Sequence, residues 1–130
     1  MAFLIHSVEH GRVPAFEYLP CSAITPKVGM ALVQSGGNLA LASGATKPAY
    51  ISMIEKETAC AAGDIIPVIR VDEGIVFETE SSAAFTNIKL GNKVTLASDG
   101  LRVTATTTDG VAEVVHIEDT ASGGMVRVRF

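Results

Sequence analysis

Two histidines near the beginning of the sequence, His6 and His10, are spaced so that a helix would bring both imidazoles to one face. Glu9 lies between them, and the segment superficially resembles the HExxH pattern of zinc proteases. In that pattern the glutamate directly follows the first histidine, whereas Glu9 directly precedes the second. A glycine and a proline soon follow and would end a helix, and the remaining histidine, His116, is distant in sequence. We therefore predict that the histidines form no metal site.

The two cysteines, Cys21 and Cys60, are the next candidates for chemistry. A thiol paired with a histidine base would be a nucleophile, but only if a nearby base stabilised its thiolate. Cys60 lies in the segment Thr-Ala-Cys-Ala-Ala, whose small apolar residues favour a buried, inert thiol. The sequence has no CxxC motif and no signal-peptide pattern, so we expect two buried thiols in a reducing compartment. A disulfide between them is the alternative.

A group of carboxylates surrounds a predicted turn, namely Asp72, Glu73, Glu78 and Glu80. Paired carboxylates perform acid–base catalysis when their environments differ strongly. These four lie in a turn and on an alternating strand, so we interpret them as a solvated face or as a polar surface for a basic partner. The Ser-Gly-Gly segments lack the following helix of a phosphate loop, and the Asp-Gly turns lack the dense oxygen ligands of a calcium site. We predict no catalytic residue, no metal and no cofactor.

The elements that carry these residues are short strands joined by glycine-containing turns. Residues 28–42 hold two apolar runs around Ser35-Gly36-Gly37-Asn38, which predicts a hairpin because Gly and Asn accept positive φ. Residues 49–54 predict another strand. The runs 65–71 and 75–79, joined by Asp-Glu-Gly, predict a second hairpin. Pro67 would place the first of these runs at a sheet edge or at a bulge, because proline donates no hydrogen bond.

The last third of the chain predicts a meander with strands at 93–97, 101–105, 111–117 and 125–130. In the final strand Val126, Val128 and Phe130 would share the core face, and Met125, Arg127 and Arg129 the other face. Residues 81–85 are the best place for one short helix. The fold class predicted is therefore all-β, a small barrel or sandwich of about eight or nine short antiparallel strands with at most one short helix.

Residues 1–26 form an irregular segment that glycine and proline interrupt repeatedly, so no helix or inner strand is expected to run through it. We predict an extended N-terminal arm over 1–26 and a single β-barrel domain over 27–130. The arm is too rich in apolar residues for a disordered tail, and we expect it to dock on its own domain, a neighbouring subunit or a larger lattice. Its candidate interaction residues are Phe3, Leu4, Ile5, Val13, Phe16, Tyr18 and Leu19.

The composition favours a part of an assembly. Of the 130 residues, 48% are hydrophobic and only 18% are charged, whereas charged residues usually make up about a quarter of a soluble chain. Such a chain exposes more apolar surface than a monomer tolerates, which favours a homo-oligomer. The net charge is −4, and the ten basic residues form no cluster, so we expect no nucleic-acid partner. No apolar run reaches the length of a membrane helix, so we expect no membrane partner.

Two stretches resemble known families. From Thr25-Pro26 to Thr79, through GMALVQSGGNLALA, Pro-Ala-Tyr-Ile and DIIPVIRVDEGIVFET, the order of arm, hairpin and strands resembles the lambda-type head decoration proteins of tailed phages. The tail, LGNKVTLASDGLRVTATTTDGVAEVVHIED followed by GGMVRVRF, is similar to small β-barrel proteins from head gene clusters of phages and prophages of Gram-positive bacteria. The extra C-terminal meander and the long apolar arm depart from the lambda-type pattern.

The resemblance implies a non-enzymatic virion structural protein that decorates or stabilises a phage capsid. Decoration proteins of this type form trimers at local three-fold axes of the expanded capsid, and their N-terminal arms add to sheet edges of the shell protein. We accordingly expect a homo-oligomer, with a trimer favoured, whose partner is the major capsid protein lattice. It would be made in the host bacterial cytoplasm and located on the capsid surface. The alternatives are another phage head or tail component, or a β-barrel module that binds a small molecule or glycan.

Overall fold

The structure is a computed structural model that describes residues 2–9 and 11–130. Within these ranges it contains ten strands and no helix, in two five-stranded sheets whose neighbouring strands are antiparallel. Sheet A has the strand order β1 (Leu4–Val8), β7 (Ile75–Glu80), β10 (Met125–Arg129), β9 (Ala112–Ile117), β8 (Lys93–Val94). Sheet B has the order β2 (Glu17–Pro20), β6 (Ile65–Arg70), β5 (Tyr50–Ser52), β3 (Ala31–Ser35), β4 (Asn38–Leu41). The all-β prediction is confirmed.

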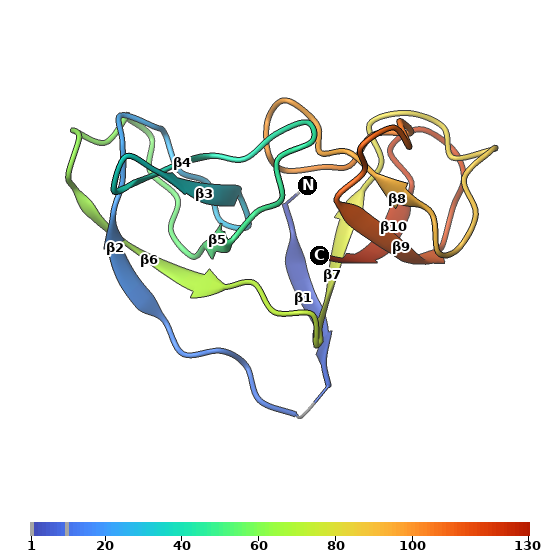
Figure 1. The fold of residues 1–130 in the computed structure, drawn as a ribbon, viewed down its shortest axis with the longest axis horizontal. Helices are drawn as coiled ribbons and strands as arrows, with labels where there is room; N and C mark the ends of the chain where they lie inside the picture. The colour runs from blue at the N-terminus through green and yellow to red at the C-terminus, as the bar shows by residue number, and fades with distance from the viewer. Residues whose placement is uncertain (1, 10) are drawn as a thin grey trace.

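The two sheets lie side by side and form two lobes (Figure 1). Sheet B makes the lobe drawn at the left, sheet A makes the lobe at the right, and β1 runs beside β7 between them (Figure 1). Neither sheet is closed into a barrel, so the architecture is sandwich-like. The edges of sheet B approach each other at one point, an isolated parallel bridge between Cys21 and Leu39.

One hydrophobic core joins the two lobes. It contains Ala31, Ile51 and Ile69 from sheet B together with Phe77 and Val128 from sheet A. Aromatic rings are central to this core: Phe130 meets Phe3 edge-on at 5.4 Å between ring centroids and Phe77 at 5.7 Å. Such pairs add about 0.5–1.5 kcal/mol each beyond the area they bury. Because this cluster contains residues of both sheets, the contact between the sheets is part of the hydrophobic core.

Sheet B curls so that its edge strands β2 and β4 approach each other, and a second core fills the space inside the curl. Its buried residues are Cys21, Met30, Leu32, Leu39, Tyr50, Cys60, Ile66 and Val68. Ser22, just after β2, donates to the Leu39 carbonyl from both its backbone nitrogen and its hydroxyl, each at 2.8 Å. These bonds hold the end of β2 against the opposite edge strand, β4, and so close one end of the curl over the second core.

The first predicted hairpin is confirmed. β3 pairs with β4 in the register Ser35↔Asn38, and Gly36 and Gly37 in the turn have φ of 60° and 86°. Two successive residues with positive φ are what a two-residue hairpin turn requires, and glycine reaches them without a steric cost. The alternation predicted for the final strand is also confirmed, because Val126 and Val128 are buried while Arg127 and Arg129 lie on the other face.

The second predicted hairpin is wrong. β6 and β7 are consecutive in the chain, but β6 pairs with β2 and β5 in sheet B, whereas β7 pairs with β1 and β10 in sheet A. The turn at 72–74 does form: the Gly74 nitrogen donates to Asp72 Oδ1 at 2.8 Å and the Ile75 nitrogen to the Asp72 carbonyl at 3.1 Å. It carries the chain from one sheet to the other. Turn residues specify a local reversal of the chain, and the pairing of the flanking strands depends on partners distant in sequence.

Pro67 does not lie on an edge strand, since β6 has β2 on one side and β5 on the other. Its carbonyl accepts a bond from the Met53 nitrogen at 3.0 Å, so its own nitrogen faces the same side, just beyond the last residue of β5. Toward β2 it forms the pair Tyr18↔Pro67, and that side needs no donor from Pro67 because N–H and C=O of one residue point the same way. An inner strand tolerates this proline because its neighbour ends there.

Two further predictions fail in the C-terminal third. Residues 101–105 form no strand; Val103 makes only isolated bridges to Ser81 and Leu96. Residues 81–85 form no helix, because their backbone donors bind partners distant in sequence: Ser82 donates to the Val103 carbonyl at 2.8 Å and Phe85 to the Thr120 carbonyl at 2.7 Å. Long-range bonds thus replace the local ones that a helix needs.

The N-terminal segment belongs to both sheets. β1 is an edge strand of sheet A and β2 an edge strand of sheet B, which agrees with the expectation that no inner strand runs through 1–26. Of the three docking partners left open by the sequence, the structure shows the first, the chain's own domain. Phe3, near the start of this segment, is 2% exposed within the shared core.

Candidate functional site

The seven candidate interaction residues divide into two groups. Phe3, Ile5 and Leu19 point inward, Phe3 and Ile5 against the shared core and Leu19 against the second core. The other four remain exposed to solvent: Leu4 by 46%, Val13 by 64%, Phe16 by 49% and Tyr18 by 65%. Only the second group is available to a partner in this conformation, and two of its members, Phe16 and Tyr18, lie just before and in β2.

The exposed residues of β2 continue onto β6. Tyr18 pairs with Pro67 and Pro20 with Ile65, and residues directly opposite in a sheet share a face. Ile65 is 60% exposed. We call the surface made by Phe16, Tyr18, Pro20, Ile65 and Pro67 the apolar face. Along β6 the same side of the sheet is buried at Ile69, where sheet A covers it. The apolar face is therefore the uncovered remainder of the side by which sheet B packs on sheet A.

Sequence reasoning missed Ile65. It belongs to the near-continuous apolar run 65–71, in which no alternation distinguishes an outward residue from an inward one. The neighbouring Ile66 is only 1% exposed. The sequence feature that could have indicated Ile65 is Pro67, because a proline limits the hydrogen bonds that its strand forms with a neighbour.

A charged pair joins β2 and β6 on the face opposite the apolar face. Arg70 of β6 donates from Nε and an Nη to the two carboxylate oxygens of Glu17 on β2, at 3.0 and 2.9 Å. The guanidinium also lies 5.1 Å from the centroid of the Tyr50 ring. The hydrogen bonds that Arg70 donates to Glu17, and then the charge interaction with Tyr50, raise the pKa of Arg70 above its ordinary value. The planar, bidentate geometry adds a side-chain link between β2 and β6 to their backbone pairing.

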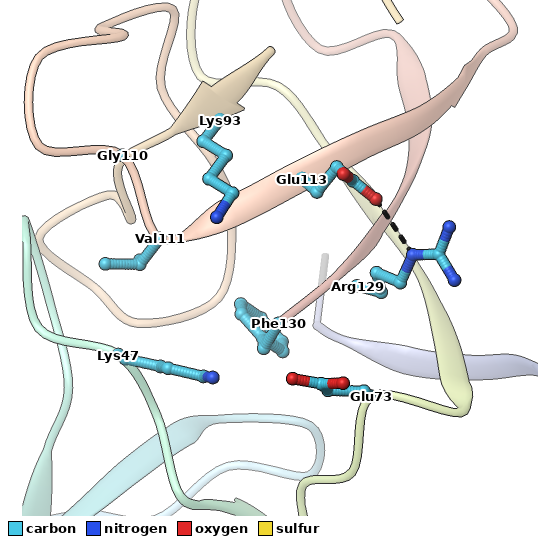
Figure 2. Close-up of a pocket in the computed structure, with 8 residues that line it drawn as sticks. All are labelled: Lys47, Glu73, Lys93, Gly110, Val111, Glu113, Arg129 and Phe130. Carbon is cyan, nitrogen blue, oxygen red and sulfur yellow. Dashed lines mark hydrogen bonds and ion pairs between the residues drawn. The ribbon is translucent and has the colours of Figure 1, made fainter. Parts of the chain in front are cut away.

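A pocket of about 470 Å³ lies between the two lobes. It is lined by Lys47, Glu73, Lys93, Gly110, Val111, Glu113, Arg129 and Phe130. Glu113 accepts a bond from Arg129 Nε at 2.9 Å (Figure 2). Lys47 and Glu73 point toward each other, and the ammonium group of Lys93 points into the hollow (Figure 2). The pocket carries charges of both signs, so it suits a small polar ligand better than an apolar one.

The histidines do not assemble into a site. His6 is exposed, and its Nδ1 lies 3.3 Å from the Ser7 hydroxyl. His116 Nε2 lies 3.0 Å from the Glu118 carboxylate on the surface. His10, the other half of the predicted spacing, lies outside the described residues. Across residues 2–9 and 11–130, no group of three or more His, Cys, Asp or Glu side chains is arranged to hold a metal ion.

The cysteines lie in the same core. Cys21 and Cys60 are both buried and both free thiols, and both belong to the second core. Burial, and then the interaction with the Cys60 thiol, raise the pKa of Cys21 from 9.0 to about 11. A thiol in this state is a poor nucleophile at neutral pH, so Cys21 lacks the lowered pKa that a cysteine nucleophile requires.

The predicted acidic surface is dispersed over two elements. Asp72 and Glu73 lie in the turn between the lobes, where Asp72 stabilises the turn and Glu73 lines the pocket. Glu78 and Glu80 are on β7, where Glu78 lies opposite Arg127 and Glu80 opposite Met125. The four carboxylates therefore do not form a catalytic pair.

No protein-family model matches the sequence, and no curated protein matches it significantly. In the part of the chain that the structure describes, no helix is long and apolar enough to cross a membrane. The function must be argued from the apolar face and the pocket.

Proposed function

We propose that this protein is a non-enzymatic structural subunit of a phage virion, which decorates or stabilises the capsid as a homo-oligomer, with a trimer favoured. The observation that carries the proposal is the apolar face. Tyr18 and Ile65, two large apolar residues each more than half exposed, lie in neighbouring cross-strand pairs on the same side of a sheet. Contiguous apolar surface of this kind marks an interaction site more often than isolated exposed residues do.

The position of the apolar face supports contact between copies of the chain. β2 is the edge strand of sheet B, so its backbone groups on the outer side are open to a further strand. Tyr is also among the residues most enriched at protein interfaces, because its ring combines apolar area with a hydroxyl group. The resemblance to lambda-type decoration proteins supports the same function, and it names the major capsid protein lattice as the second partner.

The first experiment is the solution mass of the intact chain, measured by light scattering across a concentration series. We expect a discrete oligomer, with three times the chain mass of 13.6 kDa favoured. Deleting the segment before residue 25 would be a poor variant, because it removes β1, β2 and the core residue Phe3. A monomer at every concentration would remove the self-association part of the proposal.

The pocket between the lobes favours a second candidate function, a module that binds a small polar molecule or glycan. Its support is that Lys47, Lys93 and Arg129 line one hollow of about 470 Å³, into which the Lys93 ammonium group points (Figure 2). Thermal unfolding in the presence of inorganic phosphate, acetate or glucose tests it. A midpoint that rises with ligand concentration in the wild type but not in Lys93→Glu would support this function; equal midpoints in all conditions would count against it.

A further inference from the structure

Cys21 and Cys60 are distant in the sequence, but the fold brings their side chains together. Cys21 directly follows β2, and Cys60 lies in the loop that joins β5 to β6. Both side chains belong to the second core, where both residues are almost fully buried. The sequence alone left open whether these residues meet.

The backbone holds the two segments in register around the thiols. Cys21 donates from its nitrogen to the Asp64 carbonyl and accepts at its carbonyl from the Gly63 nitrogen, each at 2.8 Å. Cys60 donates to the Ile24 carbonyl at 2.8 Å. The loop is braced as well, because the Ala61 nitrogen donates to Asp64 Oδ2 at 2.9 Å. Three bonds between the segments therefore fix the approach of the two sulfur atoms.

We propose that Cys21 and Cys60 form a disulfide site, which oxidation by a low-molecular-weight disulfide such as oxidised glutathione converts from two thiols into one covalent link. The link joins the end of β2 to the loop between β5 and β6. The structure supplies what a new disulfide usually lacks, namely two cysteines in one core cluster on segments held together by backbone bonds.

The reaction has two exchange steps. With the loop transiently open, the Cys60 thiolate attacks one sulfur of oxidised glutathione, which forms a mixed disulfide and releases one glutathione thiolate. The Cys21 thiolate then attacks the Cys60 sulfur, which forms the Cys21–Cys60 bond and releases the second glutathione thiolate. Two protein thiols are oxidised, one glutathione disulfide is reduced to two thiols, and the two protons lost by the cysteines pass to the glutathione thiolates.

Both thiols are buried in a cluster with Met30, Leu39, Tyr50 and Ile66. Glutathione reaches them only when the loop between β5 and β6 opens, so the reaction is slow in the native protein. The thiols therefore persist in a reducing cytoplasm. If the proposed function holds, the chain passes with the virion into an oxidising environment, where the disulfide would form and persist. This last step rests on the proposed function, whereas the chemistry of the site does not.

The test uses the purified, fully reduced, full-length protein incubated with oxidised glutathione under native conditions. We expect a mass about 2 Da lower from the loss of two hydrogens and a single linked peptide that contains both cysteines. The thermal midpoint should rise by about 10 °C, because the link closes a long loop of the unfolded chain. Cys60→Ala and Cys21→Ala should show neither change.

Three results would overturn the disulfide site: thiols that stay reduced until the protein is unfolded in urea, stable mixed disulfides with glutathione, or disulfides between two chains. None of them depends on whether the protein binds a capsid. Failure of this inference and failure of the proposed function are therefore distinguishable.

Discussion

Tyr18 on β2 lies directly opposite Pro67 on β6, on the uncovered side of sheet B. The pairing places a tyrosine that is 65% exposed beside a residue with no N–H group, in a cross-strand position that needs no hydrogen bond from it. The same arrangement leaves Ile65 exposed two residues before the proline. The apolar face therefore follows from how β2 and β6 pair, and Glu17 and Arg70 link the same two strands at their other end.

A charge placed in the apolar face should prevent self-association. In Tyr18→Glu or Ile65→Glu, a carboxylate would have to be desolvated at the contact between copies. We therefore expect the dissociation constant of the oligomer to rise at least about tenfold, which corresponds to about 1.4 kcal/mol or more. Light scattering across a concentration series measures this. Leu90→Glu is the matched control, because Leu90 is also exposed but lies far along the chain from this face. Equal dissociation of all three variants would argue against the apolar face as the interface.

Neighbouring residues of the N-terminal strand should differ sharply in their effect on stability. Phe3→Ala removes a buried ring that packs on Phe130, and we expect the free energy of unfolding to fall by about 3–5 kcal/mol. Leu4→Ala removes an exposed side chain on the opposite face and should change it by less than about 0.5 kcal/mol. Urea denaturation compares the two. Similar small effects would mean that β1 is not part of the folded core.

Two glycines in turns should respond differently to substitution by alanine. A Cβ at Gly110 would overlap the carbonyl of Lys93, so the backbone must shift, and we expect a loss of about 3 kcal/mol. A Cβ at Gly123 meets nothing within 4 Å, although φ there is 81°, so Gly123→Ala should cost only about 1 kcal/mol. Thermal and urea unfolding of both variants provide the comparison, and a larger loss for Gly123→Ala would contradict the packing of β8 against the 110 turn.

The buried thiol pair predicts a pH dependence of stability. The pKa of Cys21 is 9.0 for an ordinary thiol and about 11 in the folded protein, so the folded state holds this proton more tightly than the unfolded state. The stability this contributes is fully present below pH 9 and is lost as the pH rises toward 11. Measured under reducing conditions, the free energy of unfolding should fall more steeply over this range in the wild type than in Cys21→Ser. Parallel curves would contradict the assignment.

Local patterns in the sequence predicted the parts of the fold that local physics determines. The turn at Ser35–Asn38 was predictable because its glycines must adopt positive φ, and the faces of Val126 and Arg127 were predictable because strands alternate. The assignment of β6 and β7 to different sheets was not, since each is paired by strands far away in sequence. The same limit explains why Val103 makes isolated bridges and why Ser82 and Phe85 form no helix.

Only part of the candidate site could be predicted, because burial also depends on contacts between residues far apart in the sequence. The apolar content of the N-terminal segment singled out Phe16 and Tyr18, which are exposed, but also Phe3, which is in the core. Composition identifies residues that must be covered, and only the tertiary fold determines which ones the chain covers itself. The pocket between the lobes was invisible to sequence reasoning, because Lys47, Glu73 and Lys93 come from three separate elements.

The most direct test of the account is co-sedimentation of the purified chain with expanded capsids, assembled from the major capsid protein of the genome that encodes it. We predict saturable binding at a fixed number of chains per capsid, with Leu90→Glu binding like the wild type. Tyr18→Glu should bind much more weakly, because loss of the oligomer removes multivalent attachment to the lattice. Absence of wild-type binding to these capsids would contradict the central claim.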